Sequence, residues 1–177
     1  MNTPVVAFVG LGSNLGDSVG FLEQALLGLD AIPGSRLLRR SRLYRTPAWG
    51  VTDQPDFLNA VAMLQTTLPA RELLQELLEL EREAGRVRRE DGADRWGPRT
   101  LDLDLLMHGG SRFDEAGLCV PHPRLHERAF VLLPMLEIAP EVVVPGRGPA
   151  RELLDAMDAD GIEALPYADP LPPGATC

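Results

Sequence analysis

Residues 99–107 read RTLDLDLLM, an alternation of apolar and acidic side chains that is typical of a β-strand. Successive side chains of a strand point to opposite faces, so the leucines at odd positions are expected to face a core. Asp102 and Asp104 would then share the other face, about 6.5 Å apart at a rise of about 3.3 Å per residue. This stretch therefore predicts a strand over 101–107 that has one apolar face and one acidic face.

Hydrophobic periodicity on both sides of this strand predicts a series of strands and helices. Further strands are expected over 4–10, 37–46, 57–67 and 142–144, and helices over 18–29, 69–84, 127–139 and 151–157. Gly10, Gly12 and Gly16 are expected to end the first strand in a tight turn that places Ser13 and Asn14 near a site. The order of the elements favours an α+β sandwich whose sheet contains antiparallel strands.

The length and composition are those of a globular protein, with 177 residues of which 45% are hydrophobic and 24% charged. We expect a single domain over residues 1–165 and a Pro-rich tail over 166–177. No apolar run reaches the roughly 20 residues of a membrane span, and the N-terminus lacks the basic start of a signal peptide. We therefore expect a cytoplasmic protein without a membrane partner. Two cysteines are too few to indicate a disulfide scaffold.

The charge balance excludes several function classes. The net charge is −9, from 26 acidic and 17 basic residues, which disfavours nucleic acid as a partner. Every basic residue is arginine, so the lysines of P-loop proteins, protein kinases and Schiff-base enzymes are absent from the sequence. Five arginines fall within the fourteen residues 86–99. This local cluster in an acidic chain favours a small anionic ligand over a polymer.

Two neighbouring motifs can carry metal and phosphate chemistry. Asp102 and Asp104 on one strand face suit a divalent cation, and arginine forks bind phosphate in a bidentate way. Together they favour a site in which Mg²⁺ bridges carboxylates and phosphate oxygens. The alternatives are an edge strand with a solvated acidic face and, for residues 85–99, an exposed loop of mixed charge.

Two other motifs are less specific. His122 and His126 have the spacing of a zinc pair, but Pro123 disfavours helical backbone at His122, which we therefore place before the helix. A histidine that contacts phosphate is the favoured interpretation. The glycine-rich residues 10–17 follow a strand and precede a helix, yet their spacing matches neither a dinucleotide fingerprint nor a P-loop.

The motifs taken together resemble one enzyme family. They are GLGSNLGD at 10–17, LYRTPAWG at 43–50, DQPDFLNAV at 53–61, RWGPRTLDLDLL at 95–106 and VPHPR at 120–124. In this order they resemble the 6-hydroxymethyl-7,8-dihydropterin pyrophosphokinases of folate biosynthesis. The resemblance implies a ferredoxin-like α-β-α core with a mostly antiparallel sheet. It also implies Mg²⁺-dependent transfer of diphosphate from ATP to the pterin hydroxymethyl group, with release of AMP and with two Mg²⁺ ions.

The resemblance also implies roles for individual residues of this sequence. The predicted metal ligands are Asp102 and Asp104, which form the catalytic group together with Arg88, Arg95 and Arg99. The predicted ATP contacts are Glu81, Arg88, Arg95, Trp96, Arg99, His122 and Arg128. The predicted pterin contacts are Thr46, Pro47, Trp49, Phe57, Asn59 and Phe130. Asn59 would bind the polar edge of the ring, and Phe57 and Phe130 would stack on its faces.

This chain departs from the family pattern at Phe57, where tyrosine is common, and at Trp49, where a smaller apolar residue can occur. The predicted partners are ATP and the pterin, and we expect a monomer; no residue is assigned as a general base. Two other functions stay open from the sequence. One is a nucleotide- or pterin-binding module without catalysis, and the other is a different ATP-dependent transferase that acts on a small heteroaromatic substrate.

Overall fold

A computed structural model describes residues 3–47, 55–85 and 101–166, and its centre is an antiparallel sheet. The strand order is β10-β3-β4-β1-β5, and β2 pairs with β4 beside β3. The strands of this sheet are β1 (Val5–Ser13), β2 (Ser35–Arg40), β3 (Tyr44–Thr46), β4 (Phe57–Thr66), β5 (Asp102–His108) and β10 (Glu163–Ala164). The long strands β1 and β4 form its middle, with β5 on the outer side of β1.

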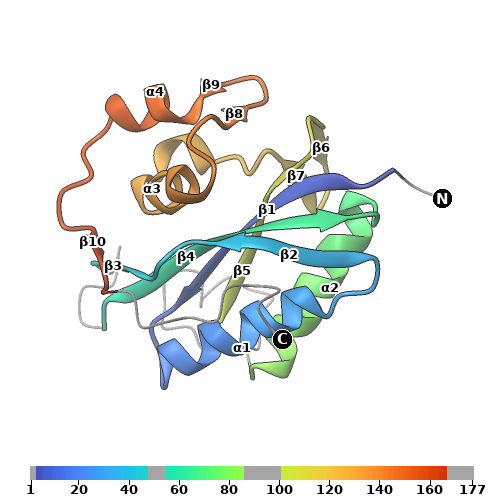
Figure 1. Ribbon diagram of the computed structural model, residues 1–177, viewed down its shortest axis with the longest axis horizontal. Helices are drawn as coiled ribbons and strands as arrows, with labels where there is room; N and C mark the ends of the chain where they lie inside the picture. Colours follow the sequence, from blue (N-terminus) through green and yellow to red (C-terminus); the bar gives the residue numbers. More distant parts are fainter. Residues whose placement is uncertain (1–2, 48–54, 86–100, 167–177) are drawn as a thin grey trace.

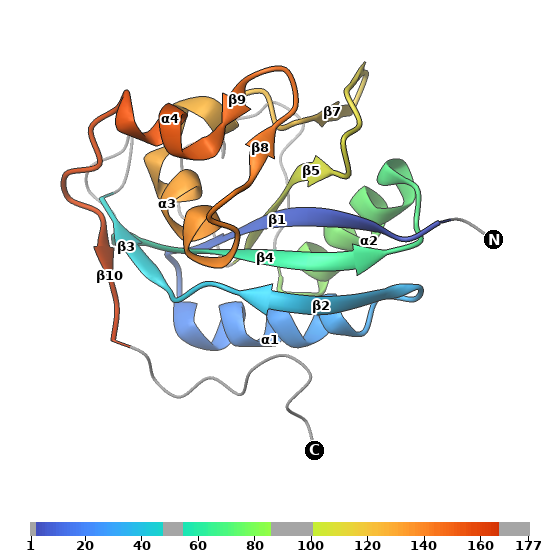
Figure 2. The same cartoon turned by 45° about the horizontal axis from the view of Figure 1, so that its top comes forward.

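Helices cover both faces of the sheet, as Figures 1 and 2 show. Helices α1 (Ser18–Asp30) and α2 (Ala70–Glu83) pack on one face, and α3 (Ala129–Ile138) and α4 (Ala150–Asp155) lie over the other. Two short hairpins extend the second side, namely β6 (Phe113–Glu115) with β7 (Leu118–Val120) and β8 (Val143–Val144) with β9 (Gly148–Pro149). The predicted α-β-α sandwich with a mostly antiparallel sheet is confirmed.

Alternation along β1 divides the core into two parts. Ala7, Val9 and Leu11 are buried in the larger core, which α1 and α2 cover. Phe8 points to the smaller core, where it joins Val61 and the apolar residues of α3. The face that carries α3 is thus identified by the even-numbered residues of β1.

The predicted glycine turn at residues 10–12 is wrong, because β1 continues through Gly10 and Gly12 to Ser13. Both glycines pair with β4 on one side and with β5 on the other, so neighbouring strands satisfy their backbone groups. The chain turns only at Gly16, which has a positive φ of 72° that glycine adopts at little cost. Pairing with β4 and β5 therefore outweighs the local preference of glycine for turns.

Other boundaries differ from the sequence prediction for similar reasons. The strand predicted over 37–46 is two strands, because the Ser41 hydroxyl accepts the Val61 amide at 2.9 Å and interrupts the pairing. Helix α1 begins where expected, since Asp17 Oδ1 accepts the Gly20 amide at 3.1 Å. Helix α3 starts late, at Ala129, after a 3₁₀ turn over Leu125–Glu127.

Residue 166 alone of the predicted tail over 166–177 falls within the described part of the chain. Within the described ranges, no helix combines the length and the apolar character that crossing a bilayer requires.

Candidate active site

One row of residues crosses the middle of the sheet on the face that carries α3. Gly12 of β1 pairs with Asn59 of β4 on one side and with Asp102 of β5 on the other. Directly paired residues of neighbouring strands point to the same face. The register therefore places a predicted pterin contact, a glycine and a predicted metal ligand side by side on one surface.

Gly12, in the middle of this row, has no side chain above the sheet. A Cβ at this position would lie 3.0 Å from Asn59 Oδ1, which is closer than ordinary van der Waals contact. At Gly10, one row further along β1, a Cβ would meet only Leu106 side-chain atoms at 3.5 Å, an ordinary contact. Because Gly12 has no side chain, there is space between the amide of Asn59 and the carboxylate of Asp102.

The predicted alternation of β5 is confirmed. Leu103 and Leu105 are buried in the core under α1 and α2, while Asp102 and Asp104 are half-buried. Arg128, which immediately precedes α3, places its Nη1 3.7 Å from Asp104 Oδ2. The side chains of this pair are only 24% and 31% exposed, so water screens the ion pair less than it would at an open surface. Asp104 is therefore already close to a cationic side chain of the protein.

His122 lies in the segment between β7 and the 3₁₀ turn, before the helix as expected. Its backbone N–H donates to Leu106 O at 2.8 Å, which fixes the segment to β5. Burial, together with the nearby Arg128, lowers the pKa of His122 to about 4, although Asp102 opposes this shift. The Arg124 amide donates to His122 Nδ1 at 3.1 Å. The neutral ring then carries its proton on Nε2, which is a hydrogen-bond donor.

His126 is not brought into the same arrangement. Its Nε2 lies 3.7 Å from Glu127 Oε1, and its side chain lines a cavity that neither aspartate lines. His122 lines this cavity too, but it is also close enough to Asp102 for the carboxylate to affect its pKa.

Three of the predicted pterin contacts lie together on strands β3 and β4. Asn59 Nδ2 donates to Thr46 Oγ1 at 2.9 Å, and Thr46 pairs in register with Phe57. Asn59 and Thr46 are buried, whereas Phe57 is half-buried. Because Nδ2 is engaged by Thr46, the Asn59 carbonyl oxygen lies on the Gly12 side. The amide orientation is thus held before any ligand arrives.

Phe130 approaches this face from the first turn of α3. The Arg128 guanidinium carbon lies 5.7 Å from the centre of the Phe130 ring, within the range of a cation–π contact. Arg128 therefore links the aspartate pair to the aromatic residue. Pro47 is exposed at the end of β3.

A polar network that the sequence did not indicate ties α3 to β3. Tyr44 pairs in register with Asn59, and its hydroxyl donates to Glu137 Oε1 at 2.6 Å. Arg42 donates to the same carboxylate through Nε at 3.0 Å and through its backbone amide at 2.8 Å. Burial and the Glu137 carboxylate raise the pKa of Tyr44 to about 12. Tyr44 and Glu137 are 93 positions apart in sequence, so no local signal connects them.

Glu81 lies on the other side of β5. It is 2% exposed on α2, and its Oε1 accepts the backbone N–H of Leu103 at 2.8 Å. This bond holds the strand that carries both aspartates, and the role of Glu81 as an ATP contact stays a prediction. The remaining predicted residues lie outside the described residues; they are Trp49, Arg88, Arg95, Trp96 and Arg99.

Comparison with known proteins identifies a matching family and similar sequences. The profile of the 7,8-dihydro-6-hydroxymethylpterin-pyrophosphokinase family matches residues 8–140. The chain is similar to the 2-amino-4-hydroxy-6-hydroxymethyldihydropteridine pyrophosphokinase of Methylorubrum extorquens, with 46% identity over 90% of this chain and 98% of the relative. The protein of the same name from Pseudomonas aeruginosa is 44% identical over 91% of this chain and 97% of the relative.

Solved structures share the fold. The crystal structure of wild-type Plasmodium falciparum HPPK-DHPS with STZ-DHP superposes with a TM-score of 0.65 over 88% of this chain. The identity is 14%, and this chain spans 42% of that longer protein. At such low identity the likeness concerns the fold alone.

Proposed function

The chain belongs to the 7,8-dihydro-6-hydroxymethylpterin-pyrophosphokinase family, and on this basis we propose how its residues divide the work of the reaction. It transfers diphosphate from ATP to the hydroxymethyl group of 6-hydroxymethyl-7,8-dihydropterin in folate biosynthesis. The products are the pterin diphosphate and AMP. Such transfers depend on alignment and on neutralisation of charge more than on covalent catalysis.

The observation that carries the assignment is the row of Asn59, Gly12 and Asp102. Two strand spacings of about 4.8 Å separate its ends by about 10 Å. This span suits a bicyclic ring held at its polar edge by Asn59, with its hydroxymethyl group directed toward the aspartates. Gly12 provides the space that the ring crosses.

Asp102 and Asp104 are assigned to Mg²⁺. Mg²⁺ is commonly held by one or two carboxylates together with substrate phosphates, and the half-buried pair on β5 fits that requirement. When bound, Mg²⁺ neutralises and orients the transferred phosphates. We propose two ions, following the family resemblance.

Arg128 and His122 are assigned to the ATP phosphates. Arg128 is already positioned near Asp104, and the neutral His122 presents Nε2–H as a donor on the same side. Neither residue has to gain or lose a proton near neutral pH to bind an anion. Arg88, Arg95, Arg99, Trp96 and Glu81 complete the proposed ATP site by resemblance to the family.

The pterin ring is assigned to the surface formed by the end of β3 and the start of β4. Asn59 would accept hydrogen bonds from the donor groups of the ring through Oδ1, since Thr46 holds its Nδ2. Phe57 and Phe130 would stack on the two faces of the ring. Pro47 and Trp49 are assigned to the rim.

The direct test is incubation with ATP, Mg²⁺ and the hydroxymethyl pterin, followed by separation of nucleotides and pterins. AMP and the pterin diphosphate are expected in equal amounts. ADP in place of AMP would indicate a different ATP-dependent transferase, and binding of both substrates without any product would indicate a binding module. Asp102→Asn serves as the matched control, because it keeps the shape of the side chain and removes its charge.

The pocket assignment has its own test in calorimetry. Asn59→Ala and Phe130→Ala are expected to weaken pterin binding, the former by about 1–3 kcal/mol because a polar ring edge loses its partner. ATP binding should be unchanged in both variants. Weaker ATP binding with unchanged pterin binding would contradict the assignment. The monomeric state and the cytoplasmic location stay predictions from the sequence.

A further inference from the structure

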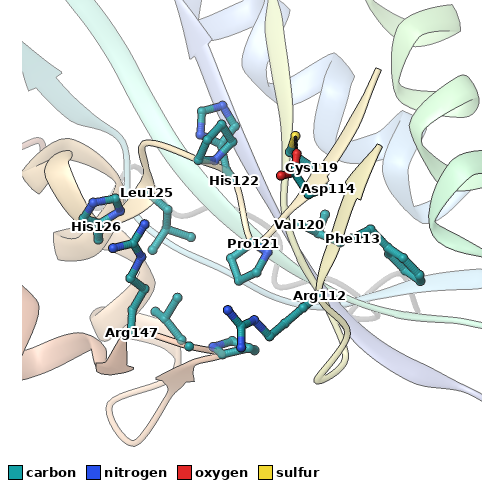
Figure 3. A pocket seen from close by; sticks show the side chains of 14 residues that line it. Arg112, Phe113, Asp114, Cys119, Val120, Pro121, His122, Leu125, His126 and Arg147 are labelled. Carbon is teal, nitrogen blue, oxygen red and sulfur yellow. Dashed lines mark hydrogen bonds between the residues drawn. The ribbon is translucent and has the colours of Figure 1, made fainter. Parts of the chain in front are cut away.

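A cavity lies beside the candidate active site, along the segment that carries His122. It has a volume of about 700 Å³, within the usual range of about 300–1,000 Å³ for small-molecule sites. The walls are the β6–β7 hairpin, the 121–126 segment and the turn between β8 and β9, as Figure 3 shows. His122 is the one residue of the proposed ATP and pterin sites among the described residues that line it.

The turn between β8 and β9 sets two arginines at the rim of this cavity. Gly146 has a positive φ of 77°, and a Cβ built on it would lie 2.8 Å from Arg112 Cζ. The Arg112 guanidinium therefore rests directly on the backbone of Gly146. The next residue, Arg147, donates its backbone N–H to Val144 O at 2.9 Å, and its side chain extends toward His126 in Figure 3.

The carboxylates of the described residues leave these two cations without an acidic partner. Neither Arg112 nor Arg147 forms an ion pair or a side-chain hydrogen bond in the ranges that the structure describes. Asp114 is the acidic residue of the lining, and it accepts from Cys119 Sγ at 3.4 Å. By contrast, Arg40, Arg42 and Arg71 each pair with a glutamate.

Beside these polar groups, the lining also has an apolar part. Pro121 and Leu125 lie between the two arginines in Figure 3, and Val144 and Pro145 add to this apolar part. Guanidinium groups bind phosphate and carboxylate in a bidentate way, while an apolar wall favours a carbon skeleton or a ring. The lining thus combines the two parts of an amphipathic anion.

We propose that this cavity binds a small organic anion, with its phosphate or carboxylate group at Arg112 and Arg147 and its apolar body against Pro121 and Leu125. Among the described residues the cavity shares only His122 with the proposed ATP and pterin sites, and we expect it to bind the anion while the active site is occupied. The inference goes beyond the transfer reaction and does not require the residue roles proposed for it.

The test uses phenyl phosphate and benzoate as probes and isothermal titration calorimetry as the readout. The enzyme is first saturated with Mg²⁺, a non-hydrolysable ATP analogue and the pterin, so that the active site is occupied. Saturable binding of at least one probe is expected. Arg112→Gln and Arg147→Gln should each weaken it at least about tenfold, since a hydrogen bond to a charged group is lost. Phosphate and carboxylate ligands are distinguished by which probe binds more tightly.

Arg151→Gln is the matched control, because Arg151 is an exposed arginine on α4 that does not line the cavity. It should bind the probes like the unaltered protein. Arg112→Lys should bind more tightly than Arg112→Gln, which separates loss of charge from loss of folding. Turnover should be normal in all of these variants. The proposal is overturned if neither probe binds below about 10 mM, if the glutamine variants bind equally well, or if binding appears only when the active site is empty.

Discussion

The two faces of the same sheet are built from alternate residues of the same strands, yet they differ in character. Under α1 and α2, β1 and β5 present a continuous apolar surface of Ala7, Val9, Leu11, Leu103 and Leu105. On the face of α3, the same strands present Gly10, Gly12, Asp102 and Asp104 at one end. The face under α1 and α2 therefore contributes mainly to stability, and the face of α3 carries the candidate catalytic residues. Neighbouring residues of one strand belong to opposite faces.

The largest effect is expected for the aspartates of the α3 face. Asp102→Asn and Asp104→Asn should each reduce turnover by about 10³-fold, because charge stabilisation of several kcal/mol is lost. The free energy of unfolding should change little, since both side chains are half-buried. Steady-state kinetics and thermal unfolding check both parts. Near-normal turnover at ordinary Mg²⁺ concentration would show that the metal assignment is wrong.

Leu103, between the two aspartates, is expected to affect stability rather than turnover. Leu103 is 2% exposed, so Leu103→Ala should lower the free energy of unfolding by about 2–5 kcal/mol through a cavity. The fraction that stays folded should turn over at a rate within a few-fold of the unaltered enzyme. Urea denaturation and activity at low temperature measure the two quantities. A loss of turnover as large as that of the aspartate variants would mean that the faces are not separable.

The glycines of β1 sharpen the comparison within the α3 face. Gly12→Ala places a Cβ 3.0 Å from Asn59 Oδ1 and should weaken pterin binding by about 1–3 kcal/mol through overpacking. Gly10→Ala meets Leu106 at an ordinary 3.5 Å and serves as the control, with an expected effect below that of Gly12→Ala. Calorimetry with pterin and, separately, with the ATP analogue decides it. Equal effects of the two substitutions would contradict the proposal that Gly12 provides space for the pterin ring.

The network between β3 and α3 predicts a smaller change. Tyr44→Phe removes the hydrogen bond to Glu137 and should cost about 1 kcal/mol of unfolding free energy at neutral pH. The folded-state pKa of Tyr44, about 12, lies above its ordinary value of 10.0. Its contribution is therefore complete below about pH 10 and is lost as the pH rises toward 12. Ultraviolet titration should show a late phenolate transition that Tyr44→Phe abolishes; its persistence in the variant would assign it elsewhere.

A pH effect on stability is expected from His122 in the metal-free protein. Its pKa of about 4 lies below the ordinary 6.5, so the unfolded chain takes up a proton between these values while the folded chain does not. Stability should therefore fall as the pH decreases from about 6.5 to 4. Proton NMR, with the resonance assigned through His122→Gln, should show a ring that titrates near pH 4. A midpoint near 6.5 would contradict the buried, neutral ring.

The alternation at residues 101–107 was predictable because it is local, and the same holds for the periodicity of α1 and α2. The row of Asn59, Gly12 and Asp102 was not, since it depends on the register of three strands that are distant in sequence. For the same reason the glycines of β1 were mistaken for a turn. Local propensity favoured a turn, whereas the ladders on both sides required a strand.

The candidate site was predicted through motifs more than through physics. Asn59, Thr46 and Phe57 lie together, and so do Asp104 and Arg128, while the roles that the resemblance implies for them stay predictions. Tyr44 and Glu137 were missed, because a tyrosine on an expected strand and a glutamate on an expected helix give no sign that they meet.

The short strand β10 has a consequence for how this protein behaves at high concentration. The chain returns to β3 through Glu163 and Ala164, and Leu165 donates its amide to Leu43 O at 2.9 Å. The backbone of β3 is thereby capped from within the same molecule and is no longer a template for intermolecular pairing. The neighbouring β2, which borders the rest of β4, carries the exposed Arg36 and Arg39, whose like charges disfavour pairing with a second copy. Strand β10 thus protects the edge of β3 from intermolecular pairing. Shortening the chain before residue 163 would remove this protection and expose the edge.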